Sequence, residues 1–327
     1  MSNLLREYYQ MQRRTMILGA AGAAALSSLP FQAALASSFP EKEVKLIVPF
    51  KPGGATDIIY RVTSEAAVKT FGKPIVIVNM GGAGGSKGAR FVKGAPPDGY
   101  TALAGHDFLF TTYYGKLSNF QYTAFEPVCL LTQTPNIIVA RPGLPFRDFH
   151  GLVEYLKKNP GKLTVTYSPA STGTLFFKQV FALAGVPESA ARVVTINGTG
   201  PQIRAVLGGN VDIAMGNVPS ALSFAKEKKL MMLAASSEKR LEACPEVPTL
   251  KELGVNFTFA TNRGVFLPKG APAEAVEKLA AAYRSALADP GVQKKIRDLG
   301  SIPEYKKPRD YAEFLKGQDR LYRESFK

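Results

Sequence analysis

The sequence predicts an α/β fold in which mostly parallel β-sheets are flanked by helices, and three observations support this. Short apolar runs alternate with helical patterns from residue 44 onward, as in folds whose strands are joined by crossover helices. Several runs are apolar at every position, which is typical of strands buried on both faces. The 327 residues, 46% hydrophobic and 20% charged, are enough for two domains that share a cleft.

The first elements form a predicted βαβ unit. The run 44–50 is a predicted strand, and a helix follows from about 57 to 71 with apolar residues at helical spacing. A second apolar run, 75–78, closes the unit.

More strands and helices follow in alternation. The predicted strands are 101–105, 126–132, 136–140, 163–167, 192–196, 211–215, 230–235 and 263–267, and the predicted helices are 87–94, 149–158, 173–184, 200–208, 219–227 and 272–287. No helix separates 126–132 from 136–140, which predicts that the chain crosses there between two sheets, at a candidate hinge. The stretch from Tyr311 to Tyr322 has one apolar and one basic face and predicts an amphipathic helix docked on the core.

The N-terminus has the pattern of a bacterial export signal. Arg13-Arg14 precedes an uncharged stretch rich in Ala and Gly, and Ala34-Leu35-Ala36 supplies a cleavage signal. We expect cleavage after about Ala36 and a periplasmic mature protein. The paired arginines resemble a twin-arginine signal, although a Sec signal also carries basic residues, so both routes stay open. The stretch is less apolar than a membrane-spanning helix requires, which disfavours a permanent anchor. An uncleaved N-terminal anchor is the alternative.

The charge and the cysteines restrict the function classes. A formal net charge of +15 is compatible with nucleic acid, a membrane surface or an anionic small molecule as partner, and charge alone does not choose among them. Nucleic acid is disfavoured, because the basic residues are scattered and form no nucleic-acid-binding motif. Cys129 and Cys244 are too far apart for a CxxC motif. Two buried, unpaired thiols are the favoured interpretation, and a disulfide is the alternative in an oxidising compartment.

Four glycine- and hydroxyl-rich loops each join a predicted strand to a predicted helix. They lie at 49–57, 168–174, 197–201 and 216–220. Glycines let backbone amides approach a ligand, and the amides at a helix N-terminus attract anions. In the first loop, Thr56 or Asp57 is expected to cap the helix. Open α/β sheets bind ligands where such loops meet, so the four loops predict an anion-binding crevice.

Several patterns that would indicate catalysis fail. The segment 82–88 lacks the glycines that a dinucleotide or Walker A loop requires. It does match G-x-S-x-G around Ser86, so a periplasmic serine hydrolase is the alternative from another class, but a loose loop separates Ser86 from the preceding strand. Only two histidines occur, His106 and His150, and no Cys/His cluster predicts a metal site. We therefore predict no enzyme activity, no catalytic residue, no metal and no cofactor.

Taken in order, the loop motifs resemble those of the tripartite tricarboxylate transporter receptors, also called the Bug family. The segments that carry the resemblance are V-P-F-K-P-G-G-A-T-D at 48–57, G-G-A-G-G-S-K-G-A at 81–89, A-P-P-D-G-Y-T at 95–101, N-P-G-K-L at 159–163, L-G-G-N-V-D at 207–212, N-V-P-S-A at 217–221, E-V-P-T-L-K-E-L-G at 246–254 and L-P-K-G-A-P at 267–272. The resemblance runs from about residue 40 to the C-terminus.

The resemblance implies a two-lobed fold like that of type II periplasmic binding proteins, with the ligand cleft between the lobes. Lobe 1 is expected at 37–137 plus 258–327 and lobe 2 at 138–257, after a signal peptide at 1–36. It implies a monomeric receptor that captures a small organic anion, a mono- or dicarboxylate, and delivers it to the membrane permease subunits of a tripartite tricarboxylate transporter. A binding protein that signals to a membrane partner is the alternative within this fold.

The resemblance also implies which residues hold the ligand, mainly through backbone amides and small hydroxyl groups. They are Gly53, Gly54, Ala55, Thr56, Asp57, Ser168, Ser171, Thr172, Gly173, Thr174, Asn197, Gly198, Thr199, Gly216 and Asn217. Asp57 repels a carboxylate, so its expected task is to cap the helix and organise the loop, or to bind an amino group if the ligand carries one. Gly216 replaces larger residues common in the family and leaves room for a bulkier ligand. His106 and Asp107 stand where small residues are common, and His106 is a further candidate, for a second polar end of the ligand.

Overall fold

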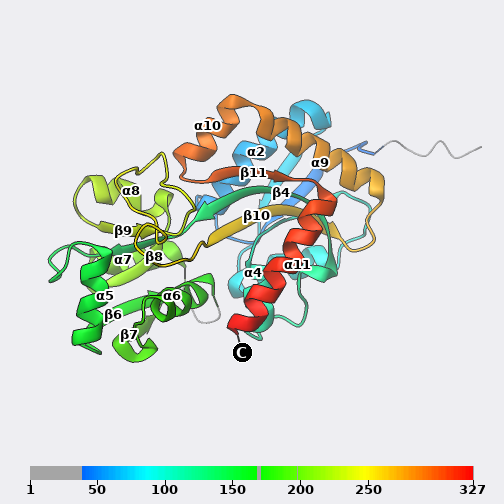
Figure 1. The fold of residues 1–327 in the computed structure, drawn as a ribbon. Helices are drawn as coiled ribbons and strands as arrows, with labels where there is room; N and C mark the ends of the chain where they lie inside the picture. Colours follow the sequence, from blue (N-terminus) through cyan, green and yellow to red (C-terminus); the bar gives the residue numbers. More distant parts are fainter. Residues whose placement is uncertain (1–38, 168–170, 197, 327) are drawn as a thin grey trace, which may run out of the picture. The chain divides into compact units, whose positions relative to one another are not determined.

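Two mixed β-sheets, each flanked by helices, organise the part of the chain that the computed structural model describes, residues 39–167, 171–196 and 198–326 (Figure 1). The predicted α/β class is therefore confirmed. The predicted export signal lies outside the described residues. Within the described ranges, every helix is too short or too polar to cross a lipid bilayer.

The first sheet contains both N-terminal and C-terminal strands. Its members are β1 Val44–Val48, β2 Ile75–Asn79, β3 Thr101–Gly105, β4 Phe125–Pro135, β10 Ala260–Pro268 and β11 Ile302–Lys306. Their order across the sheet is β11-β4-β10-β3-β1-β2. β1 is parallel to β2 and β3, whereas β10 is antiparallel to β3 and β4, and β11 is antiparallel to β4.

The second sheet is formed by the middle of the chain. Its members are β5 Ile137–Ala140, β6 Leu163–Tyr167, β7 Ala191–Thr195, β8 Ile213–Gly216 and β9 Met231–Ala235. Their order is β7-β6-β8-β5-β9. β6 is parallel to β7 and β8, and β5 runs antiparallel to β8 and β9.

Helices connect the strands and cover the sheets. The α-helices are α2 Ala55–Phe71, α3 Ser86–Lys93, α4 Phe108–Tyr114, α5 Phe149–Lys158, α6 Thr172–Leu183, α7 Thr199–Leu207, α8 Val218–Lys226, α9 Ala273–Ala288, α10 Pro290–Asp298 and α11 Pro308–Ser325, and the 3₁₀ turns are η1 Ala83–Gly85, η2 Tyr122–Ala124 and η3 Glu188–Ala190. α2 is held on the first sheet by the buried Tyr60, whose hydroxyl lies 2.7 Å from the carbonyl oxygens of Gly105 and Gly264. This contact fixes the start of α2 beside β3 and β10.

The C-terminal amphipathic helix, α11, docks on the core as predicted. Tyr311, Leu315 and Tyr322 are buried on its inner face. The ring of Tyr322 stacks on Phe110 of α4 with ring centroids 5.2 Å apart, and Figure 1 shows α11 beside α4. The apolar face of α11 is therefore part of the hydrophobic core beside the first sheet and is not a free surface.

The chain crosses between the sheets at two adjacent places. β4 leads through Asn136 into β5, and the chain returns through Phe259 into β10. The buried Ser236 joins the two crossings, because its hydroxyl oxygen accepts from the Asn136 N–H at 2.9 Å and lies within hydrogen-bond distance of the Phe259 carbonyl oxygen. The predicted strand pair without a helix between is therefore the crossing itself.

The structure differs from the sequence prediction in strand direction and in three elements. The sheets are mixed rather than mostly parallel, because β4, β5 and β10 run through the crossing against their neighbours. β11 was not predicted because its sequence, IPEYK, is polar and begins beside a proline. α10 and the seven-residue α4 were also missed, and α4 is mostly aromatic and Thr, without an apolar period.

Candidate functional site

The carboxyl ends of three parallel strands of the first sheet lie at one edge. β2, β1 and β3 are neighbours in that order, so the loops that follow them, at 49–54, 80–85 and 106–107, lie beside one another. Contacts confirm the arrangement: the rings of Phe50 and His106 stack with centroids 4.9 Å apart. A Cβ at Gly88 would lie 2.9 Å from both Met80 O and Pro49 Cβ, so the second loop packs closely on the first.

The second sheet repeats this arrangement. β7, β6 and β8 are parallel neighbours, and the predicted loops follow each of them. Gly173 lies close to the end of β6, since a Cβ there would be 3.0 Å from Tyr167 Cβ and 3.6 Å from Met215 Cε. Ser168 and Asn197, both predicted to bind the ligand, lie outside the described residues.

In both sheets, the edge that carries the predicted loops lies beside a strand at the crossing, β10 in the first sheet and β5 in the second. We call β4, β5 and β10 the crossing strands. Gly105 at the end of β3 pairs with Gly264 of β10, and Gly216 at the end of β8 pairs with Ile137 of β5. Because β10 and β5 are antiparallel to these partners, their first residues lie next to the loops. The strand topology thus brings the predicted loops of both sheets to the same segments, 134–137 and 259–263.

Asp57 organises the first loop and does not cap α2. Its carboxylate accepts from the Gly53 N–H and Arg61 Nε, both at 3.0 Å, and from Asn79 Nδ2 at 2.8 Å. Burial opposes ionisation, but these hydrogen bonds, with Arg61 first, hold the pKa of Asp57 below its usual value. The expected task in loop organisation is what these contacts show.

The predicted side-chain cap of α2 is wrong. The N-cap is Gly54, which has no side chain, and Asp57 reaches back to Gly53 instead of to the helix amides. Thr56 is also engaged elsewhere, since its hydroxyl accepts from Arg263. The amides of Ala55, Thr56 and Asp57 have no intrahelical acceptor, and within the described ranges no other acceptor is assigned to them.

Arg263 is a buried cation at the start of β10 that sequence reasoning missed. Its side chain donates from Nε to Thr56 Oγ1 at 3.1 Å and from Nη1 to Thr134 Oγ1. It therefore ties α2 to both crossing strands. Burial lowers the pKa of Arg263 to about 10, and the guanidinium still carries its charge at neutral pH. The available signal was Thr261-Asn262-Arg263, a polar triplet opening an otherwise apolar strand.

His106 and Asp107 occupy the loop after β3. Asp107 is buried and accepts from the backbone N–H of Asn262 at 2.6 Å and from its Nδ2 at 3.0 Å. Burial raises the pKa of Asp107 to about 6 against the effect of these bonds. Burial, reinforced by the charge of Arg263, lowers the pKa of His106 well below its usual value. His106 Nδ1 accepts from the Phe108 N–H at 3.2 Å, so Nε2 carries the proton of the neutral ring.

The side chains of the second sheet's loops mostly cap helices. Ser171 accepts from the amides of Gly173 and Thr174 at the start of α6. At the start of α8, the side-chain oxygen of Asn217 accepts a hydrogen bond from the Ser220 N–H at 3.2 Å. In turn, the Ser220 hydroxyl oxygen accepts from the Asn217 N–H at 3.1 Å. Gly198 is the N-cap of α7, with φ of 90°. The loops therefore present three helix N-termini, of which those of α6 and α8 are held by side-chain caps and that of α7 begins at a glycine. Helix N-termini of this kind favour anions.

The remaining predicted positions are backbone sites. Thr172 and Thr199 are the first residues of α6 and α7. A Cβ at Gly216 would lie 3.2 Å from a side-chain carbon of Val139 and 3.4 Å from one of Ile203. A larger residue at the end of β8 would therefore crowd these two side chains.

The serine, the cysteines and the metal-ligating residue types considered from the sequence form no further site among the described residues. Ser86 is buried and donates to the Ala83 carbonyl at 2.8 Å, within its own loop. Cys129 and Cys244 are buried and unpaired, so the favoured interpretation of free thiols is confirmed. In the ranges that the structure describes, no group of His, Cys, Asp and Glu is arranged to hold a metal ion.

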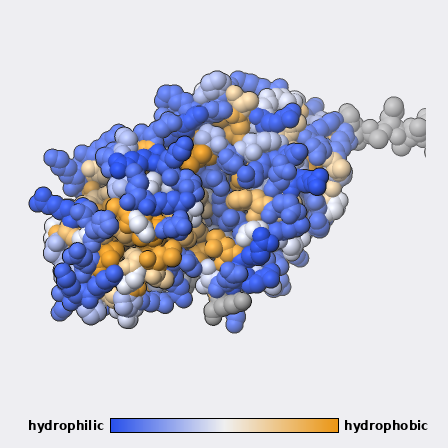
Figure 2. Space-filling view, viewed as in Figure 1, coloured by the Kyte–Doolittle hydropathy of each residue, from blue (hydrophilic) through white to orange (hydrophobic). Residues whose placement is uncertain are grey.

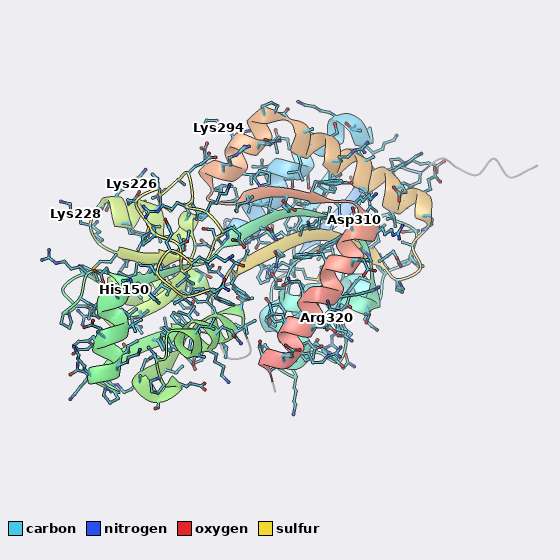
Figure 3. All side chains as sticks on the ribbon, viewed as in Figure 1. His150, Lys226, Lys228, Lys294, Asp310 and Arg320 are labelled. Carbon is cyan, nitrogen blue, oxygen red and sulfur yellow. The ribbon has the colours of Figure 1, made fainter. Side chains whose placement is uncertain are left out.

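The surface formed by the described residues also has two hollows, an apolar cluster and dispersed basic side chains. Two open hollows of about 690 and 680 Å³ share Arg90 and Leu117 near α3 and contain none of the predicted ligand residues. Figure 2 shows apolar side chains gathered around α6, where Leu183 is 51% exposed, on an otherwise largely hydrophilic face. Figure 3 shows Lys226, Lys294 and Arg320 well apart, so the basic charge is dispersed, and His150 is exposed on α5.

Comparison with known proteins identifies relatives over most of the chain. A family model described as the tripartite tricarboxylate transporter family receptor matches residues 59–325. A curated protein of Agrobacterium vitis, from the TAR-I ttuE-ttuC′ intergenic region, is 33% identical over 278 residues, which cover 84% of this chain and 80% of that protein. The protein BugT of Bordetella pertussis is 27% identical over 285 residues, covering 86% and 87%.

Solved structures have the same fold. The periplasmic binding protein BugD is 31% identical with a TM-score of 0.77, over 88% of this chain and 97% of that chain. MatC from Rhodopseudomonas palustris, with bound malate, is 30% identical with a TM-score of 0.78, over 88% and 100%. Another R. palustris protein, solved with adipate, is 27% identical with a TM-score of 0.79, over 88% and 97%.

Proposed function

The chain belongs to the tripartite tricarboxylate transporter receptor family, and from this premise we propose that it is an extracytoplasmic receptor for a small organic carboxylate. The observation that carries the proposal is the meeting of two sets of strand-end loops at the crossing strands. Helix N-termini in both sets attract an anion without any reacting group. A receptor of this kind binds and releases its solute unchanged.

Dicarboxylates are the first ligands to consider. Malate and adipate occupy two solved relatives of about 30% identity. The proposed contacts are the loops that begin α2, α6, α7 and α8, at the residues predicted from the sequence, with His106 at the far end. The amides of residues 55–57 are a ready set of donors for one carboxylate, since none of the described residues accepts from them.

Capture involves movement of the two sheets about their crossing. At the crossings themselves the connections are short: Asn136 alone separates β4 from β5, and Phe259 leads directly into β10 at the end of the longer segment 236–259. Ser236 joins the two crossings by hydrogen bonds. Few residues would therefore absorb the backbone rotation as the loops close on a ligand.

The route of export and the partner belong to the same proposal. Residues 1–36 act as an export signal of the twin-arginine type, cleaved after about Ala36, and the mature monomer hands its ligand to the membrane subunits of a tripartite tricarboxylate permease. The basic excess remains after cleavage, because the signal contains only three arginines and one glutamate among its charged residues.

A thermal-shift screen of residues 37–327 tests the proposal. We expect stabilisation by malate, adipate or another small carboxylate, and none by the matching diamide. A ligand at 100 times its Kd adds about 2.7 kcal/mol to the free energy of unfolding. Mass spectrometry of the recovered ligand should find it unchanged. Failure of mono-, di- and tricarboxylates alike to stabilise the protein would contradict the proposal, and conversion of the ligand would contradict a receptor role.

A further inference from the structure

Arg263 is a buried charged group at the predicted site that makes no direct ion pair with any described residue. Its side chain is 3% exposed, and no ion pair joins it to any described carboxylate. Asp107, the acidic residue that acts on it through space, has both oxygens bonded to Asn262. Thr56 and Thr134 accept hydrogen bonds from the guanidinium but carry no charge.

A buried charge without a directly bonded counter-ion is costly for a folded protein. Removing an ion from water costs several kcal/mol, and neutral hydrogen bonds return only part of that. The depressed pKa of Arg263 has burial as its main cause and agrees with this cost. Hydrogen bonds to neutral hydroxyl groups do not require a full positive charge, so the contacts with Thr56 and Thr134 do not explain the charge of Arg263.

The third nitrogen of the guanidinium remains open to a ligand. Nη2 donates to none of the described residues. The described side-chain atoms that are both sealed from solvent and without a partner do not include it, so it has access to solvent. It belongs to the same group that contacts Thr56, in the first turn of α2, whose amides also lack acceptors in the described ranges.

We propose that Arg263 is a ligand-binding residue, and that its free Nη2 donates to an oxygen of the ligand's carboxylate at the N-terminus of α2. The proposal rests on the proposed function and adds a fixed positive charge to a site otherwise built of dipoles. The anion then serves as a directly bonded counter-ion of Arg263, which none of the described residues provides. Charge-assisted hydrogen bonds are about twice as strong as neutral ones, so the site selects an ionised carboxylate over an amide of the same shape.

Two variants of the mature protein, with a matched control, test this inference. Arg263→Gln keeps hydrogen-bond donors and removes the charge. Arg263→Lys keeps the charge and removes the planar guanidinium group with its several N–H donors. The control Arg192→Gln removes one charge from an exposed position on the edge strand β7. Calorimetric titration with malate and adipate gives the Kd of each, and thermal denaturation without ligand gives the stability.

The two roles of Arg263 predict different patterns. For a ligand-binding residue, Arg263→Gln weakens binding of the dicarboxylate about 10- to 100-fold while its ligand-free melting temperature stays equal or rises. Arg263→Lys is intermediate and Arg192→Gln binds as the unaltered protein does. For a purely structural residue, Arg263→Gln lowers the ligand-free melting temperature and leaves the Kd unchanged, which overturns the inference.

A second measurement keeps the test valid if Arg263→Gln does not fold. In the unaltered protein, ¹⁵N NMR of the arginine side chains should show one guanidinium whose Nη signals shift and sharpen on addition of dicarboxylate, and this signal should be missing from Arg263→Lys. Ligand saturation without any such change contradicts the inference alone. Absence of carboxylate binding to the unaltered protein contradicts the proposed function instead.

Discussion

Asp57 and Asp107 both lie at the loop edge of the first sheet, yet their surroundings shift their pKa values in opposite directions. Asp57 is held ionised by Arg61, Gly53 and Asn79. Asp107 is buried, and its bonds to Asn262 do not offset the loss of water, so its pKa rises to about 6. The first carboxylate shapes a loop, and the second weakens the fold when it ionises.

The raised pKa of Asp107 predicts a stability change with pH. The folded state holds this proton more tightly than the unfolded state, whose pKa is 3.8, so its stabilisation is present below pH 3.8 and lost as pH rises through about 6. Asp107→Asn removes the titration. From pH 4 to 7.5, the free energy of unfolding of the variant should therefore improve relative to the unaltered protein by about 1–3 kcal/mol, measured by urea denaturation. If the free energies of unfolding of Asp107→Asn and of the unaltered protein differ by the same amount at both pH values, the raised pKa of Asp107 is refuted.

His106 is expected to stay neutral at physiological pH. Burial and the charge of Arg263 depress its pKa, and the Phe108 amide occupies Nδ1. Long-range ¹H–¹⁵N NMR should show the Nε2–H form of His106, unchanged between pH 6 and 8, with His106→Gln identifying the signal. A titration midpoint inside that range would mean that the ring is more solvated than the structure shows.

At the scale of elements, helix starts decide both stability and binding. Asn217 caps α8 through its side-chain oxygen. Asn217→Asp keeps this oxygen and adds a negative charge where the ligand carboxylate is expected. The melting temperature should change little, while binding of malate or adipate should weaken about tenfold, as for a like charge nearby in partly screened surroundings.

The control for this change is Asn217→Ser, which also caps the helix and adds no charge. It should bind nearly as well as the unaltered protein. Equal binding by both variants would place the ligand away from α8.

The pairing of β10 with β4 depends on a glycine. A Cβ at Gly264 would lie 2.3 Å from Tyr311 Oη and 2.6 Å from the carbonyl oxygen of Cys129. Gly264→Ala should therefore cost about 1–3 kcal/mol of the free energy of unfolding through overpacking.

Gly317 on α11 has nothing within 4 Å of its Cβ position, and Gly317→Ala should stabilise the protein by about 0.5–1 kcal/mol. Denaturant midpoints measure both, and an unaffected Gly264→Ala protein would contradict the close packing of α11 on this strand.

For the whole molecule, the sequence was informative where a pattern is local. Apolar runs and helical periods predict most strands and helices, and strand-to-helix loops predict which segments gather at the sheet edges. Strand direction is not a local property, so the antiparallel course of β5 and β10 was not predictable from their apolar residues. Arg263 was missed for a similar reason, because its partners Thr56 and Thr134 are more than 120 residues away in the chain.

We expect a carboxylate to be held where the loops of both sheets meet β5 and β10. A crystal structure of residues 37–327 with the tightest-binding acid from the screen tests it most directly. We expect one carboxylate of the ligand to contact the amides of residues 55–57 and Arg263, with further contacts from Gly216 or Asn217. A ligand seated instead in the hollows beside Arg90 and Leu117, or touching the loops of only one sheet, would contradict it.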